Sequence, residues 1–214
     1  MDRVKIDFNL VEEHITTLNS IQQEYKKSDI SPEEPSKLKL LAQFYIQSGQ
    51  VNFLLHFYQD ALSDLKKAGK LLQKIDEPEA MMELNFLLGK THLEFNNFDH
   101  ADLHLKKALR IAQKIEHKDK ELHILDALGT LFANQKHPER AFRYFIQRKS
   151  LLESETENDP IQLAFTFLNI GQSIKSIDLL HALSNLFQAL SIFEKEEFNS
   201  GIEKTLLAIG NLFK

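Results

Sequence analysis

Five of the chain's seven glycines recur at a nearly constant interval along its 214 residues. They are Gly49, Gly89, Gly129, Gly171 and Gly210, so each follows the previous one by roughly 40 positions. A fixed period of this length indicates stacked supersecondary units, because each unit buries its apolar face only against its neighbours. The period therefore restricts the chain to a repeat architecture.

Other residues follow the same period. An alanine lies eleven or twelve residues after each of the first four glycines, and a second alanine follows seven residues later in three of the four units: Ala61, Ala101, Ala141 and Ala182, then Ala68, Ala108 and Ala189, with Arg148 in the third unit. A bulky apolar residue lies between them, at Leu65, Leu105, Phe145 and Leu186. We expect each unit to be two helices, with the alanines of the second helix as the contact points for the glycine of the first.

The composition favours helices over strands. Valine occurs only three times, while leucine, lysine, glutamate and glutamine are plentiful, and straight-chain residues lose little side-chain entropy in a helix. We predict helix pairs over 36–75, 79–115, 119–153 and 160–196, and a partial repeat over 200–214. An amphipathic capping helix is expected within 1–30, with its apolar face made of Ile6, Leu10, Ile15, Leu18, Ile21 and Tyr25. Linkers are expected at Ser28–Lys37 and Leu152–Pro160.

The pattern resembles the tetratricopeptide repeat (TPR) family, in which small residues lie where paired helices touch. It is carried by Leu88-Gly89, Leu128-Gly129, Ile170-Gly171 and Ile209-Gly210, together with the alanines of the second helices. The resemblance implies an all-α fold: one right-handed α-solenoid domain over 1–214, with an N-terminal helix, about four full repeats and a partial fifth. Family units are usually shorter than the units of this chain, whose greater length looks like that of repeats in bacterial signalling and regulatory proteins.

The sequence Gly89-Lys90-Thr91 raises the alternative of a nucleotide-binding loop. Such a loop needs a second glycine five residues earlier, on a turn between a strand and a helix. That position is Leu84, inside a helical pattern. We therefore interpret Gly89 as a helix-packing residue.

Chemistry of other kinds has little support. His100 and His104 have the i, i+4 spacing of a helical metal pair, but no motif supplies further ligands, so we interpret them as solvated. The chain has no cysteine, no Gly-x-Ser-x-Gly elbow and no His-Glu-x-x-His helix. We expect no catalytic residues, no cofactor and no metal, and hence not an enzyme within these residues.

One charge pattern repeats from the first unit to the second. Lys66, Lys67, Lys70 and Lys74 recur as Lys106, Lys107, Arg110 and Lys114. The rows could dock an acidic partner or nucleic acid, or they could complement helix dipoles and keep the surface soluble; we favour the second interpretation. With a net charge of −5, an N-terminus without an apolar signal core and no long apolar stretch, we expect a cytoplasmic protein with neither nucleic acid nor membrane as partner.

In the TPR family the first helix of each pair lines a concave groove. The resemblance implies that the groove is lined by the residues six and three positions before each glycine and one position after it. These are Gln43, Ile46, Gln50, Glu83, Phe86, Lys90, His123, Asp126, Thr130, Phe165, Leu168 and Gln172. Three of the four central positions are apolar, which suits a peptide with apolar anchors. Equally, Ile46, Phe86 and Leu168 could pack inside the helices. The lysine and asparagine clamp of members that bind acidic C-terminal tails is missing, so chaperone tails are not expected.

The leading hypothesis is a non-catalytic protein- or peptide-binding scaffold, the regulatory or sensory input module of a larger bacterial signalling protein. An apolar, uncapped fifth repeat suggests that the chain is the N-terminal part of a longer protein, or that it self-associates through this end. The alternatives are a peptide-responsive TPR regulator or phosphatase, which carries extra N-terminal elements, and a self-assembling structural module.

Overall fold

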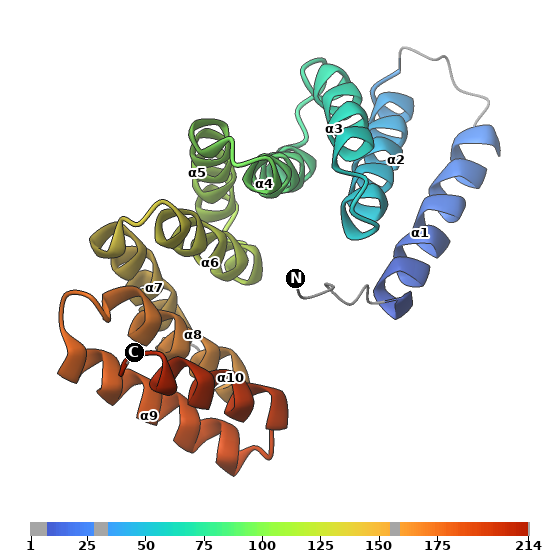
Figure 1. Cartoon of the computed structure of the whole chain (residues 1–214). Coiled ribbons are helices and arrows are strands. Elements are labelled where there is room, and N and C mark those ends of the chain that lie inside the picture. Colours follow the sequence, from blue (N-terminus) through green and yellow to red (C-terminus); the bar gives the residue numbers. More distant parts are fainter. Residues whose placement is uncertain (1–7, 28–33, 155–158, 214) are drawn as a thin grey trace. The chain divides into compact units, whose positions relative to one another are not determined.

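The computed structural model describes residues 8–27, 34–154 and 159–213 (Figure 1). Within these ranges the chain forms ten α-helices and no strand, which confirms the all-α prediction. The chain divides into two compact units, Met1–Glu116 and His117–Lys214, each of which is described by itself. The expectation of a single solenoid domain over 1–214 stays a prediction.

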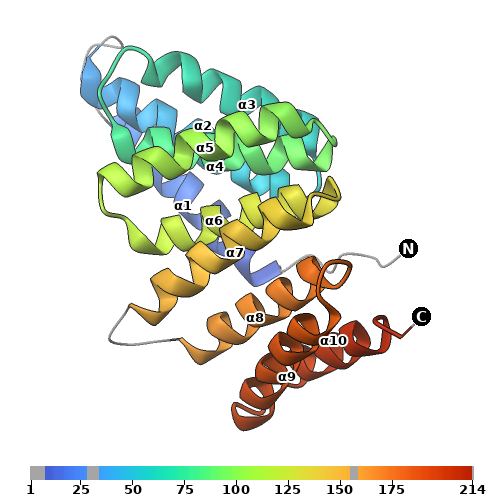
Figure 2. The same cartoon turned by 90° about the vertical axis from the view of Figure 1, so that its left-hand side faces the viewer.

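Unit 1 contains two helix pairs preceded by a single helix. The helices are α1 (Phe8–Lys27), α2 (Pro35–Leu54), α3 (Tyr58–Leu72), α4 (Pro78–Glu94) and α5 (Phe98–Lys114). α2 packs against α3 and α4 against α5, while α3 and α2 both contact α4 and so join the pairs (Figure 2). α1 packs on α2, at the place expected for the capping helix.

Unit 2 repeats this arrangement and adds a last, unpaired helix. Its helices are α6 (Lys118–Asn134), α7 (Pro138–Glu153), α8 (Pro160–Ile174), α9 (Leu179–Lys195) and α10 (Asn199–Gly210). α6 packs with α7 and α8 with α9, and α10 contacts both α8 and α9. The four full pairs and the partial fifth repeat therefore have the predicted order.

Local sequence explains where several helices begin. Proline lies in the first turn of α2, α4, α7 and α8, where its missing N–H costs no intrahelical hydrogen bond. The Asp159 carboxylate accepts hydrogen bonds from the backbone N–H groups of Ile161 and Gln162 at the start of α8. Asp178 accepts one from His181 N–H at the start of α9. These side chains satisfy backbone donors that the helix itself leaves unpaired.

Four of the turns between consecutive helices are closed by hydrogen bonds between backbone groups. His56, Asn96, Lys136 and Glu197 each follow a helix with a positive φ of 53–64°. At each turn the N–H of the next residue donates to a carbonyl five residues earlier, as in Asn97 N–H to His92 C=O at 2.9 Å. This is the Schellman arrangement, in which glycine usually takes the left-handed position. Here four different side chains take it.

The periodic glycines lie where paired helices touch. A Cβ at Gly89 would stand 2.6 Å from Leu105 Cγ, and one at Gly129 would overlap the Phe145 ring. Gly49 and Gly171 face Leu65 and Leu186 in the same way. The prediction that another helix approaches each of these glycines is confirmed. Gly210 differs, because none of the described atoms lies within 4 Å of the Cβ position there.

The expected partners of the glycines need correction. The bulky residue four positions after the alanine, not the alanine itself, supplies the nearest side-chain atoms. Ala61, Ala101, Ala141 and Ala182 are fully buried. At Gly49 and Gly171 the alanine atom among the three nearest to the Cβ position is its carbonyl oxygen. The alanine lets the helices approach, and the larger side chain then fills the space above the glycine.

Two other expectations concern the N-terminal helix and the linkers. In α1, Val11 is buried while Ile15 is 40% exposed, so Ile15 does not belong to the packed face; the side chains of Ile6, Leu10 and Tyr25 lie outside the described residues. Residues 28–33 and 155–158, where the linkers were expected, also lie outside the described residues.

None of the described helices has the length and apolar character needed to cross a membrane.

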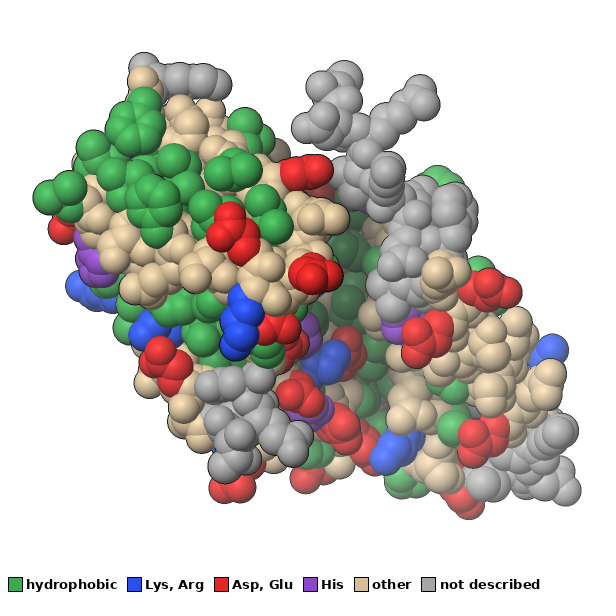
Figure 3. Space-filling view, turned by 90° about the horizontal axis from the view of Figure 1, so that it is seen from below, with side chains coloured by type: hydrophobic (Ala, Val, Ile, Leu, Met, Phe, Trp, Pro, Cys, Tyr) green, Lys and Arg blue, Asp and Glu red, His purple; other side chains and the backbone are tan. Residues whose placement is uncertain are grey.

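The apolar residues of the fifth repeat divide into two groups. Ile209 and Leu212 pack against the core of unit 2. Leu206, Leu207 and Phe213 are exposed by 53%, 64% and 70%. Ile177, Leu179, Leu180 and Phe187, in α9 and the turn before it, are also exposed. Figure 3 shows where hydrophobic side chains gather on one face of the molecule.

The glycine contact predicts a contrast between two alanine substitutions. Gly129→Ala should destabilise the chain by about 1–2 kcal/mol, because overpacking against Phe145 exceeds the gain in helix propensity. Gly210→Ala should leave stability unchanged or raise it by up to about 1 kcal/mol. Urea unfolding followed by circular dichroism measures both. A Gly129→Ala chain as stable as the parent would contradict the packing role.

Candidate functional site: a carboxamide-lined pocket

In unit 1 the structure does not gather the predicted groove residues into an open site. Ile46 is 3% exposed and belongs to the core. The side-chain amide of Gln50 lies 2.9 Å from His14 Nε2 of α1. The Lys90 ammonium lies 5.5 Å from the Phe86 ring and 4.8 Å from the Phe53 ring. Each of these side chains contacts other groups of unit 1. Gln43 on α2 and Glu83 on α4 are half-buried.

In unit 2 the apolar positions also pack inward. Leu168 is 4% exposed and lies in the core. The Phe165 ring contacts Phe193 edge-on, with ring centroids 4.9 Å apart. Of the two ways to interpret the apolar central positions, packing within the helices therefore holds for Ile46 and Leu168. The exposed positions are His123, Thr130 and Gln172.

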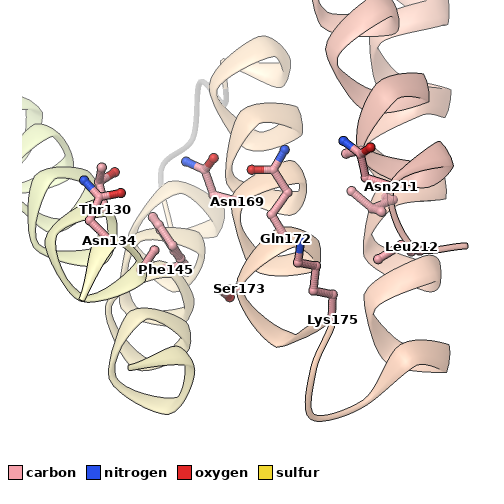
Figure 4. Close-up of a pocket in the computed structure, with 12 residues that line it drawn as sticks. Thr130, Asn134, Phe145, Asn169, Gln172, Ser173, Lys175, Asn211 and Leu212 are labelled. Atoms are coloured by element: carbon pink, nitrogen blue, oxygen red, sulfur yellow. The ribbon is translucent and has the colours of Figure 1, made fainter. Parts of the chain in front are cut away.

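A pocket of about 500 Å³ lies in unit 2 and is lined by residues from α6 to α10 and the turn after α8. Four carboxamides line it, from α6 (Asn134), α8 (Asn169 and Gln172) and the residue after α10 (Asn211). Figure 4 shows them in a row across the three first helices of the unit, with Thr130 beside Asn134. The apolar part of the wall includes Phe145, Leu186 and Leu212.

A second hollow of about 280 Å³ adjoins this pocket. It shares Asn169, Gln172, Ala208 and Asn211 with the first, and adds Phe165, Leu168, Lys204 and Leu207. Four predicted residues, Thr130, Phe165, Leu168 and Gln172, thus line one or both hollows. Among the described lining residues, the only charged side chains are those of Lys175 and Lys204.

Partly buried polar contacts hold the middle of the row in place. Asn169 donates from Nδ2 to Asp126 Oδ1 at 3.0 Å, which joins α8 to α6. The same carboxylate oxygen lies 3.9 Å from Nε of Arg148, a side chain that is 5% exposed. Arg148 Nη1 donates to the carbonyl of Gln162 at 3.0 Å and to the Thr166 hydroxyl. Asp126 therefore acts as a positioning residue behind the pocket rather than as a lining one.

Burial lowers the pKa of the Arg148 guanidinium, and the carboxylates of Asp126 and Asp159 act in the opposite direction. Sequence reasoning noted Arg148 only as an interruption in the alanine pattern. A buried arginine needs partners for its donors, but the sequence does not say which side chains supply them. Here they come from α6 and α8.

Three of the four carboxamides were missed from the sequence. Asn211 directly follows Gly210. In the same way Gln50, Lys90, Thr130 and Gln172 directly follow the other four periodic glycines. Extending the register to Gly210 would have found it. Asn134 and Asn169 lie five after and two before their glycines, outside the positions carried over from the family, and they reach the pocket because both helices extend along it.

The predicted histidine pair lies in unit 1 and is not fully solvated. His104 is half-buried and its Nδ1 lies 2.9 Å from Asn85 Oδ1 of α4. His92 of α4 stacks on both His100 and His104, with ring centroids 5.1 and 5.7 Å apart. Among the described residues no group of three or more His, Asp and Glu side chains could hold a metal ion. The interpretation as solvated histidines is right for His100 and wrong for His104, which faces α4.

Helix pairs that repeat with the glycine period, and that have a glycine at each full pair's contact, define a TPR-like repeat fold. No protein-family model and no curated protein sequence matches the chain. Solved structures do match it. Aspartyl phosphate phosphatase F from Bacillus subtilis is 18% identical, with a TM-score of 0.72 over 99% of this chain and 60% of that one.

Two further structures have the same fold. The Rap conjugation gene regulator of plasmid pLS20, in complex with the Phr* peptide, is 16% identical, with a TM-score of 0.63 over 91% of this chain and 52% of that one. The TPR-like repeats of a protein described as a kinesin light chain from Podosopora anserina are 14% identical, with a TM-score of 0.64 over 88% and 89%. At these identities the likeness shows the fold alone. The chain spans about half to three fifths of the first two proteins.

The environment of His104 predicts a loss of stability in acid. Burial, and then the nearby His92, Lys107 and His100, lower its pKa from 6.5 to about 4. Between these values the unfolded chain binds a proton that the folded chain does not. The stabilising effect of a neutral His104 is thus complete above about pH 6.5 and is lost as the pH falls toward about 4.

His104→Gln should therefore reduce the fall in Tm between about pH 7 and about pH 5, where an unperturbed histidine becomes protonated. Differential scanning fluorimetry of parent and variant measures this. The exposed His100 on the same helix supplies the control, His100→Gln. Equal pH dependence in the parent and in His104→Gln would show that the burial of this imidazole does not control acid stability.

Proposed function

We propose that the carboxamide-lined pocket of unit 2 binds a peptide in an extended conformation, and that the chain acts as a non-catalytic scaffold or regulatory input module. One observation carries the proposal: Asn134, Asn169, Gln172 and Asn211 stand in a row on successive first helices beside an apolar wall. Each carboxamide both donates and accepts hydrogen bonds. An extended backbone presents N–H and C=O groups that such side chains can pair.

The rest of the pocket suits the same ligand. Phe145, Leu186 and Leu212 offer apolar contact for a peptide side chain. Lys175 and Lys204 add positive charge, which favours an acidic side chain or a C-terminal carboxylate. Asn169 is held by Asp126, and a pre-positioned carboxamide loses less entropy on binding.

The Rap regulator solved with the Phr* peptide supports a peptide ligand for this fold. Its own chain is longer, so an activity of the whole protein is not transferred. We further propose that the chain serves a bacterial signalling protein in the cytoplasm. The alternative is a peptide-responsive regulator or phosphatase, which the likeness to aspartyl phosphate phosphatase F favours. The carboxamide row suits recognition, and no catalytic group of the described residues is identified in the pocket.

A second candidate function is self-association through the α9 and α10 end of unit 2. Leu180 and Phe187 are exposed by 80% and 55% and lie seven residues apart, on one face of α9. Exposed apolar patches of this kind mark interaction sites more often than isolated surface leucines do. A second copy of the chain would cover them.

The peptide proposal predicts a loss of affinity in a double variant. Peptides selected from a random-sequence display library on the parent chain should bind Gln172→Ala/Asn211→Ala at least about tenfold more weakly, because two hydrogen-bonding side chains are lost. Gln188→Ala, exposed on α9 and outside both hollows, should bind like the parent. Fluorescence anisotropy measures the affinities. Selected peptides that bind the double variant and the parent equally would place recognition elsewhere.

Self-association predicts a concentration-dependent mass. The parent should grow heavier with concentration in sedimentation velocity, while Leu180→Glu/Phe187→Glu should stay monomeric, because charged side chains oppose burial of this face. Gln188→Glu introduces a charge on an exposed position of the same helix and should behave like the parent. A parent that is monomeric at every concentration would remove this candidate.

A further inference from the structure

A separate pocket of about 650 Å³ lies in unit 1, among α3, α4 and α5. Its floor is apolar and includes Met81, Leu84 and Leu88 of α4 and Ile111 of α5. Gly69 of α3 also lines it, and its lack of a side chain widens the opening. The volume falls within the range of ligand-binding clefts. None of the lining residues belongs to the carboxamide-lined pocket.

Four cations surround this apolar floor. Lys66 and Lys70 come from α3, and Lys107 and Arg110 come from α5. All four are exposed, and among the described residues none makes an ion pair. Within the part of the chain that the structure describes, no Asp or Glu lines the pocket. The repeat thus places two basic rows along one opening.

The neighbouring lysines behave differently. Lys67 Nζ lies 2.8 Å from Asp64 Oδ1, and Lys106 Nζ lies 2.7 Å from Asp102 Oδ2. Neither lysine lines the pocket. Each basic row therefore divides into a cation that is neutralised on its own helix and cations that face the opening. Complementing the helix dipole does not require this division.

Burial is the main influence on the imidazoles in the wall, and nearby lysines add to it. Burial lowers the pKa of His92, and His100 and Lys66 lower it further. Lys107 acts on the pKa of His104 in the same direction. His92 Nδ1 is buried and has no hydrogen-bond partner among the described residues. The wall therefore holds an unpaired polar atom, and the rim holds an excess of cations.

We propose that this pocket docks an acidic amphipathic helix of a partner protein. Apolar side chains of that helix enter the cavity above Met81 and Leu84, and its carboxylates pair with the cations of the two rows. Lys66 and Lys70 are four residues apart and Lys107 and Arg110 are three apart, which are the spacings at which a partner helix presents successive glutamates. Helix-in-groove binding uses this combination of an apolar stripe and flanking charges.

Charge complementarity decides between this occupant and others. Four cations spread over two helices exceed what a single carboxylate or phosphate group can neutralise. No Phe, Tyr or Trp of the described residues lines the pocket, so the stacking platform that single-stranded nucleic acid uses is missing there. An acidic helix supplies several carboxylates and an apolar face together. This site does not depend on the proposed peptide pocket of unit 2.

The test uses a fluorescein-labelled synthetic helix with leucine on one face and glutamate on the others, added to the full chain. Anisotropy should show saturable binding that weakens at high salt. Lys70→Ala/Arg110→Ala should bind about tenfold or more weakly, because two cations that face the opening are lost. Lys67→Ala/Lys106→Ala removes the same charge from the same helices outside the pocket and should change the affinity less than about threefold.

Three further arms make the result decisive. The Gln172→Ala/Asn211→Ala variant should bind the acidic helix like the parent, so a failure of the peptide proposal and a failure of this one are distinguishable. The same peptide with serine in place of leucine should lose binding, since the apolar floor is then unused. Equal binding of both double variants of the basic rows, tight binding of a leucine–lysine helix, or complete displacement by single-stranded DNA would overturn the proposal.

Discussion

The close contact between a glycine and a large side chain of the paired helix is the interaction on which the rest of the structure depends. Gly89 and Gly129 leave room for Leu105 and Phe145, and buried alanines on the second helix let the backbones approach. Because each pair then has one closest packing, the rotation of each helix about its own axis is fixed. That rotation decides which side chains are buried and which reach solvent.

The helices, their pairing and their order could be predicted because they depend on glycines, alanines and bulky apolar residues that recur in each repeat. The exposure of individual groove positions could not be predicted from the sequence. Ile46 and Leu168 were candidates for peptide anchors, yet both are buried, since neighbouring helices cover them to an extent that spacing along one helix does not reveal. Arg148 shows the same limit, because its partners Gln162 and Thr166 lie on the next helix. Register along a helix can be inferred from sequence, whereas contacts between helices need coordinates.

The two proposed binding pockets show how one repeat can carry different chemistry. In unit 2 the first helices present carboxamides, which pair with backbone groups and carry no net charge. In unit 1 the second helices present cations around an apolar floor. Both use positions that the glycine and alanine contacts leave free, so neither demands a change in the packing that builds the fold.

The four helix–helix turns that have a left-handed residue and a backbone closure have a consequence for how such a chain can vary. Because they are closed by main-chain atoms, an imidazole, a carboxamide, an ammonium and a carboxylate occupy equivalent left-handed positions at His56, Asn96, Lys136 and Glu197. The side chain at each position forms no part of the hydrogen bonds that close the turn. Surface character at these corners can therefore drift over evolutionary time, or be redesigned, without shifting the register of the helices that they join.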